Sequence, residues 1–269
     1  MQQGRSLVGM VEVPGWNEEI HDAIKALVQL VDDRLPLLTT DENHSQVRQL
    51  AAAYLARVRR LIVALDVLFG AGMPDAMGGV LRICLEAWVT GMWVLCVGQK
   101  AVDMLGADYG VTSNRYIVRT GIEAELLDVV EDAPQLPNVA ERTEAVETHL
   151  VEEGDAKVGE LMWSFRLVYG GESAAGIHAG FASVCGHIDE QDAWTGVRSA
   201  RSEASDGSGM LLWAATLLAM FARRVLLAFD VEVDDLDNAA EPIQRLGVEL
   251  NESIRSQDGV TARPPTAPS

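Results

Sequence analysis

The sequence predicts an all-α fold, a single-domain bundle of about seven to nine helices. Apolar residues recur at the three- and four-residue spacing of amphipathic helices along nearly the whole chain, and no segment alternates as a half-buried strand does. No repeat of fixed period and no linker between two cores is found. We therefore expect one helical domain over residues 14–257, an N-terminal extension over residues 1–13 and a disordered tail over residues 258–269.

The first two helices are defined by their end signals. One is expected from residue 16 to about 35, because Pro36 follows, and the next begins near Asn43 or Ser45 and runs to Phe69. Apolar residues in this second helix alternate at spacings of four and three, the pattern of an a/d seam that packs along a long partner helix, and we expect residues 208–229 to be that antiparallel partner. The seam consists of Val47, Ala51, Tyr54, Val58, Leu61, Leu65 and Leu68.

The central helix is expected over about residues 75–98. Within it, residues 81–98 carry large apolar side chains on every face, which is typical of a buried helix. The remaining elements are expected as a helical region over 99–131 with a break at 106–113, an acidic helix over 138–153, a helix over 157–169, a small-residue helix over 173–185, a long loop over 186–207, and helices over 208–229 and 234–257.

The chain is strongly acidic, and its charge bears on its partners. It has 21 basic and 40 acidic residues, a formal net charge of −19 and a pI near 4.5. Such a charge repels nucleic acid and anionic membrane, so we expect no generic nucleic-acid binding. The small basic groups would matter only if they converged in space: Arg57, Arg59 and Arg60; Arg115 and Arg119; Arg198 and Arg201.

Cysteine usage and hydropathy favour a cytoplasmic protein without a membrane partner. The chain has three cysteines, an odd number, in apolar or small-residue surroundings. Its first residues lack the apolar centre of a signal peptide. Its two most apolar stretches, residues 87–98 and 210–229, are expected to be too short or too interrupted by arginine to span a membrane.

Two charged residues in the apolar central helix are the leading candidates for a site. Arg82 and Glu86 lie one helical turn apart, and charged residues are seldom buried unless they are paired. Arginine preceding glutamate is also the weaker order for a pair on a helix surface. We therefore expect the two to form a buried pair, and we expect Glu86→Ala to cost about 3–5 kcal/mol.

A second candidate group follows in the segment YGGESAAGIH. Ser173 comes after two glycines and fits a helix N-cap, and the small residues after it would let another helix approach closely. His178 would then point into the interior, within reach of Arg82 or Glu86. An interior histidine is more often a hydrogen-bonded structural residue than a catalyst.

This combination of residues resembles a known family. Arg82 and Glu86, followed by Tyr169, Ser173 and His178, are similar to the pattern of an uncharacterised bacterial helical family known only as a domain of unknown function. The resemblance covers about residues 75–190. It implies an all-helical fold and marks these five polar positions, but it implies no reaction.

Three weaker patterns complete the set of candidates. Arg142 and His149 have a spacing similar to the motif of HEPN-type ribonucleases, but the glutamates around them (Glu141, Glu144, Glu147, Glu152 and Glu153) favour a solvated acidic face. The cluster His187, Asp189, Glu190 and Asp192 matches no known metal motif, so no metal site is predicted. Arg198 and Arg201 are candidates for binding a phosphate or carboxylate, or else for pairing with the acidic surface.

Two functions remain open. The preferred hypothesis is a non-catalytic binding or scaffold domain with a buried Arg/Glu/His network, and a homo-oligomer formed through helix packing is compatible with it. The alternative is a helical phosphodiesterase or ribonuclease effector in stress or phage defence, with His178 as general acid/base, Arg82 holding an anion and Glu86 orienting one of them. No cofactor is indicated, and phosphate-loop, zinc and nucleophile-elbow motifs are absent from the sequence.

Overall fold

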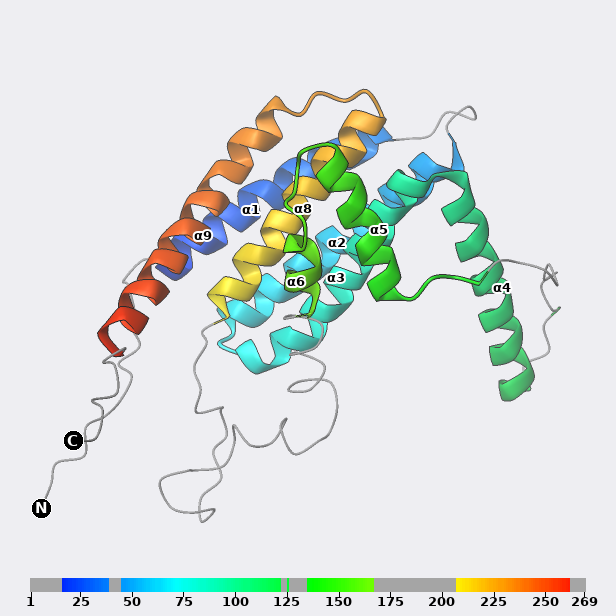
Figure 1. Cartoon of the computed structure of the whole chain (residues 1–269), viewed down its shortest axis with the longest axis horizontal. Helices are drawn as coiled ribbons and strands as arrows, with labels where there is room; N and C mark the ends of the chain where they lie inside the picture. The colour runs from blue at the N-terminus through cyan, green and yellow to red at the C-terminus, as the bar shows by residue number, and fades with distance from the viewer. Residues whose placement is uncertain (1–15, 39–44, 122–124, 126–134, 167–206, 262–269) are drawn as a thin grey trace, which may run out of the picture.

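The computed structural model describes residues 16–38, 45–121, 125, 135–166 and 207–261. Over these residues the chain forms eight α-helices and one short 3-10 helix, and this described part contains no strand. The prediction of an all-α bundle of seven to nine helices is confirmed. Figure 1 shows long helices lying side by side in the bundle, with α4 leaving it at one side.

The N-terminal half begins with α1 (Trp16–Arg34), the 3-10 helix η1 (Leu35–Leu38), α2 (Gln46–Gly70) and α3 (Pro74–Val97). The side chain of Ser45 accepts a hydrogen bond from the backbone N–H of Arg48 and so caps α2, as the sequence predicts. Between α2 and α3 the chain reverses through Gly72, whose φ of +65° suits a residue without a Cβ. The two helices therefore form a tight antiparallel pair.

The C-terminal helices α8 (Ser208–Ala228) and α9 (Asp234–Thr261) close the bundle. Ion pairs give the direction in which α9 lies on α1. Glu19 near the start of α1 pairs with Arg245 far along α9, and Arg34 at the end of α1 pairs with Asp235 at the start of α9. Helices α1 and α9 are thus antiparallel neighbours (Figure 1).

The core stripe of α2 differs from the seam that the sequence predicts. The helix is continuous, as expected, but its buried residues are Ala51, Leu55, Val58, Ile62, Leu65 and Phe69. Tyr54, Leu61 and Leu68 are only half-buried at its flank. The reason is that α2 packs against both α3 and α8, so its apolar stripe faces the groove between two helices and not a single coiled-coil partner.

The helices α2, α3 and α8 approach one another closely at Gly91 in α3. A Cβ atom at this position would lie 2.2 Å from Phe221 Cζ and 2.8 Å from Tyr54 Cβ. Only glycine therefore allows these helices to pack at this separation.

Three further helices lie beside this core: α4 (Gln99–Thr120), α5 (Val139–Glu152) and α6 (Glu160–Phe165). The predicted break at residues 106–113 is wrong, because α4 runs through it without interruption. A helical glycine costs only about 1 kcal/mol, which is too little to end a helix. A capping box, in which Asn138 and Glu141 bond each other's backbone N–H, starts α5.

The last predicted elements are described in part. α6 occupies residues 160–165 of the helix expected over 157–169, and α9 continues past Gln257 to Thr261. The expected helix over 173–185 and the loop up to residue 206 lie outside the described residues.

Among the described residues, two helices are long and apolar enough to span a membrane: Ala76–Val97 and Ser208–Ala228. The expectation that the first stretch is too short and the second too interrupted by arginine is therefore wrong by length and composition. In each, 61% of the apolar window is buried inside the bundle, as it is in the core helices of folded domains.

Candidate functional site

The polar residues of α3 lie on one face of the helix. Arg82, Glu86 and Thr90 follow at four-residue spacing, which places them in a row along one side. Thr90 is buried, whereas Arg82 is half-buried and the Glu86 side chain is 45% exposed. The expectation of a buried Arg82–Glu86 pair is therefore wrong as to burial. Their pairing with each other stays a prediction.

The fully buried charge at this face comes from α5. Arg142 is 6% exposed, and its Nη1 donates a hydrogen bond of 2.8 Å to Thr90 Oγ1. Its Nη2 lies 4.0 Å from Glu86 Oε1. The Thr90 hydroxyl in turn donates to the Glu86 backbone carbonyl at 2.7 Å. Glu86, Thr90 and Arg142 thus connect α3 to α5, and we call them the α3–α5 polar group.

Arg142 is inward-facing because it shares a face of α5 with apolar residues. Val146 and Leu150 follow at four-residue intervals, and both are buried. This spacing was visible in the sequence, and it is the signal that could have identified Arg142 as a residue of the interior.

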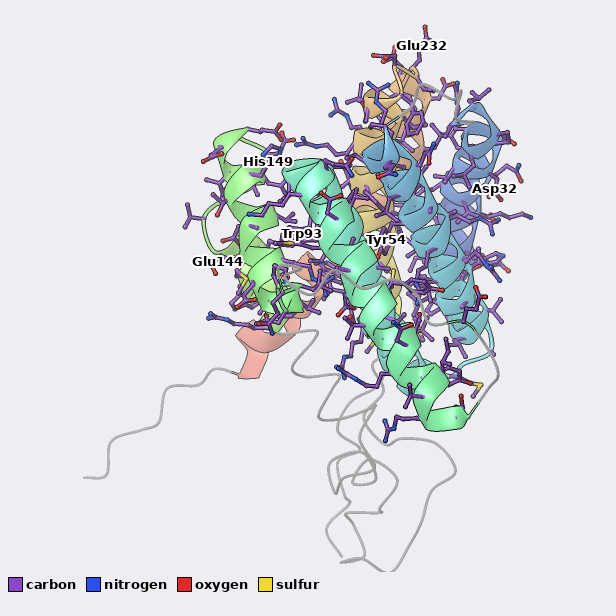
Figure 2. The ribbon with its side chains drawn as sticks, turned by 90° about the vertical axis from the view of Figure 1, so that its right-hand side faces the viewer. Asp32, Tyr54, Trp93, Glu144, His149 and Glu232 are labelled. Atoms are coloured by element: carbon purple, nitrogen blue, oxygen red, sulfur yellow. The ribbon has the colours of Figure 1, made fainter. Side chains whose placement is uncertain are left out.

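The charges of Arg142 and Glu86 also affect the pKa of Tyr54 on α2. Burial raises the pKa of its phenol, Arg142 and Arg57 oppose this rise, and Glu86 adds to it. The net direction is upward, so the hydroxyl stays protonated at neutral pH and can donate a hydrogen bond. Figure 2 labels Tyr54, and shows His149 and Glu144 along α5 at one side of the view and Asp32 at the opposite side.

Tyr54 also lines an open hollow of about 680 Å³ along α2. Arg57 and Arg60 line it too, and among the described residues no carboxylate does. Arg59 lies between them in sequence but pairs with Asp32 of α1. The apolar part of the lining consists of Leu50, Ala53, Ala56 and Leu61. The α2 hollow is therefore a positively charged, partly apolar surface on a chain of net charge −19.

The other end of α5 has a structural role. Glu147 is 8% exposed, and its carboxylate accepts hydrogen bonds from the backbone N–H groups of Gly159 and Met162 at 2.9 and 2.8 Å. These donors lie at the start of α6, where a helix has free N–H groups. The expectation of a solvated acidic face holds for the exposed Glu141, Glu144, Glu152 and Glu153, but it is wrong for Glu147.

The HEPN-like spacing does not bring its two residues to one site. Arg142 contacts Thr90 in the interior, whereas His149 Nε2 lies 3.3 Å from Glu153 and is 38% exposed. Glu153, together with Asp155, also pairs with Arg224 of α8. His149 therefore lies among surface charges that join α5 to α8.

Cys84 is a buried core thiol, as expected, whereas Cys96 is half-buried at the edge of the core. Cys84 and Cys96 are both free, and burial raises their pKa to about 12 and about 11. Such thiols carry almost no thiolate at neutral pH and are poor nucleophiles. Among the residues that the structure describes, no group of three metal-ligating side chains is found.

The remaining candidates lie outside the described residues. They are Tyr169, Ser173 and His178, the arginines Arg198 and Arg201, and the acidic cluster from His187 to Asp192. Their proximity to Arg82 and Glu86 stays a prediction.

Comparisons of the chain with family models, curated proteins and solved structures give no match. The resemblance to the helical family of unknown function therefore rests on the five residues alone. The class that the fold and site define is an all-α protein with a polar group joining α3 to α5 and a basic hollow on α2.

Proposed function

We propose that the chain is a non-catalytic helical binding protein and that the α2 hollow takes an organic anion, an acidic group attached to an apolar body. The observation that carries this proposal is the charge of the hollow. Two arginines line it and no described carboxylate does, although acidic residues outnumber basic ones by 40 to 21 in the chain. The hollow is open, with a volume of about 680 Å³, and its described lining comes from α2 alone, so it would hold a ligand against one helix face.

The lining residues suit the two parts of such a ligand. The guanidinium groups of Arg57 and Arg60 match the planar acceptor geometry of carboxylates and phosphates. The protonated Tyr54 hydroxyl supplies a further donor, and Leu50 and Leu61 offer apolar contact. A partly apolar lining with a few polar groups is the usual composition of a binding site.

The α3–α5 polar group lies close to Tyr54, because Arg142 and Glu86 both affect the pKa of its phenol. Arg142 ties α5 to Thr90, next to Gly91, and Tyr54 Cβ lies at the same crossing. Hydrogen bonds between buried polar groups favour one packing arrangement. In this proposal Arg142 and Glu86 position Tyr54 and do not contact the ligand.

The test is calorimetric titration with octyl phosphate as the probe, and with octanol as its uncharged analogue. We expect octyl phosphate to bind and octanol to bind more weakly. Arg57→Gln and Arg60→Gln should each weaken octyl phosphate binding by roughly tenfold, because each removes a charge-assisted hydrogen bond. Lys25→Gln, an exposed change on α1 with the same loss of charge, should leave binding unchanged.

Equal weakening by Lys25→Gln would show that net charge governs binding and would contradict the α2 site. Equal binding of octanol and octyl phosphate would contradict the anionic ligand. An absence of binding by both probes would contradict the proposal for single-chain amphiphilic anions.

We also propose a cytoplasmic location, which the free thiols of Cys84 and Cys96 support. Ribonuclease activity is the alternative function that the sequence suggests. It requires His178, which lies outside the described residues. Within the described part, His149 is held by Glu153, so no observation there favours it.

A further inference from the structure

The outward face of α4 combines exposed aromatic and charged residues. Tyr109 and Tyr116 are 68% and 60% exposed, and Asp108, Thr112, Arg115 and Arg119 are exposed beside them. Together with the half-buried Leu105, these residues follow the repeating intervals of three, one and three residues from position 105 to position 119. Such intervals place them on one side of the helix. We call them the α4 stripe: Leu105, Asp108, Tyr109, Thr112, Arg115, Tyr116 and Arg119.

The beginning of α4 is anchored in the described bundle, and Gly110 in the middle of the helix is also buried. Ala101 and Met104 are buried, and Gln99 donates a hydrogen bond of 3.0 Å to Gln46 of α2. Beyond this point the helix continues to Thr120, and Figure 1 shows its second half standing clear of the other helices. The α4 stripe thus lies on a projecting helix with its tyrosines in solvent.

We propose that the α4 stripe is a homodimer interface, in which α4 of one chain packs antiparallel on α4 of a second copy about a two-fold axis at Thr112. The charges of the stripe are self-complementary in this arrangement. Asp108 lies four residues before Thr112 and Arg115 three residues after it, so each Asp108 faces the Arg115 of the other copy. In a two-fold interface every contact between two different residues occurs twice, once in each direction between the chains, and the Asp108–Arg115 pair meets this requirement.

The tyrosines follow the same symmetry. Tyr109 lies three residues before Thr112 and Tyr116 four after it, so the Tyr109 of one chain meets the Tyr116 of the other. Both would bury large, mostly apolar rings while the hydroxyl groups reach the edge of the contact.

The charge of the α4 stripe favours self-association through this face. Two chains of −19 repel each other over most of their surface. The second half of the α4 stripe carries Arg115 and Arg119, and it therefore offers positive charge to a second copy of this acidic chain. An interface of one helix per chain is small, so we expect a dimer that dissociates on dilution.

The test is the molar mass of the full chain by light scattering and sedimentation, over a series of concentrations. Wild type should approach twice 29.1 kDa as concentration rises. Asp108→Arg should be monomeric, because the new guanidinium then faces Arg115 of the other copy, and Arg115→Asp should be monomeric because two aspartates then meet. An equimolar mixture of the two variants should form a heterodimer, because each faced pair again has opposite charges.

Tyr109→Ala should weaken the dimer at least tenfold, whereas Trp163→Ala, which removes an equally exposed aromatic residue from α6, should not. Circular dichroism of each variant checks that the fold is retained. A monomeric wild type, or a dimer that the α4 variants leave unchanged, would overturn the proposal. Failure of the mixed variants to associate would overturn the Asp108–Arg115 pairing.

Discussion

At the scale of single residues, the α3–α5 polar group shows how one buried charge is held in the interior. Arg142 lies in the interior, and Thr90 accepts one of its hydrogen bonds at 2.8 Å. Glu86 is farther away and 45% exposed, so water weakens its attraction for Arg142. The hydroxyl of Thr90 should therefore matter more to stability than the carboxylate of Glu86.

We predict that Thr90→Val lowers the free energy of unfolding by about 1–3 kcal/mol, because it keeps the shape of the side chain but removes an acceptor of a charged donor. Thr90→Ser, which retains the hydroxyl, should cost less. Glu86→Ala should cost about 1 kcal/mol or less, in place of the 3–5 kcal/mol expected for a buried pair. Urea unfolding of the three variants measures this order, and a larger loss for Glu86→Ala than for Thr90→Val would contradict it.

The sequence identified some of these residues and missed others. Arg82 and Glu86 stood out because they are charges in an apolar helix. Arg142 was named only for its ribonuclease-like spacing with His149, and the acidic residues around it led us to expect a solvated face and not an interior position. The contact between α3 and α5 joins residues 52 positions apart, and helical periodicity carries no information on which helices meet.

At the scale of elements, the crossing of α2, α3 and α8 depends on the missing side chain of Gly91. The nearest atom of α2 is Tyr54 Cβ, which is bonded directly to the backbone and cannot move away without the helix. Phe221 on α8 is buried, so its ring has little room to shift.

We predict that Gly91→Ala destabilises the fold by about 1–3 kcal/mol through overpacking, although alanine is the better helix former. In a Phe221→Leu background the same change should cost less, because the ring atoms nearest to the new methyl group are gone. Gly106→Ala in α4 is the matched control. Its Cβ would meet nothing within 4 Å, so it should stabilise the helix by up to about 1 kcal/mol. Equal effects of the two alanines on the urea midpoint would refute the close crossing.

Helix positions were predictable where the sequence contains local end signals. Ser45 for α2, Pro74 for α3 and Asn138 for α5 each act within one turn of the helix they start. On α2, Ala51, Val58 and Leu65 of the predicted seam are buried, but the alternate buried positions lie one residue later than predicted, because apolar residues occupy both sets of positions. Which stripe becomes buried is decided by two neighbouring helices together.

At the scale of the whole molecule, negative charge dominates, and the basic residues are distributed among separate elements. Arg57 and Arg60 line the α2 hollow, Arg59 pairs with α1, and Arg115 and Arg119 lie on α4. Nucleic-acid affinity requires several phosphates to be neutralised at once.

We therefore predict that the chain does not retain a short duplex DNA or an unstructured RNA in gel-shift assays at physiological salt. At low salt any weak retention should decline steeply as salt is added. Retention that persists at physiological salt and is lost in Arg57→Gln would contradict this prediction and would favour a phosphodiester ligand at the α2 hollow.

The pairing of α1 with α9 has a consequence for how the protein reaches its native state. α2 and α3 are neighbours in sequence, and loops of this length close within a fraction of a microsecond, so this hairpin can form while the rest of the chain is still being synthesised. α1 emerges first, but Glu19 and Arg34 find their partners only on α9, more than 200 residues later. Until then the apolar face of α1, including the buried Ile20, Ile24 and Leu27, lacks its last neighbour. A ribosome that stalls before α9 would thus release a chain with part of this face exposed, the kind of surface by which chaperones and proteases distinguish unfinished proteins from finished ones.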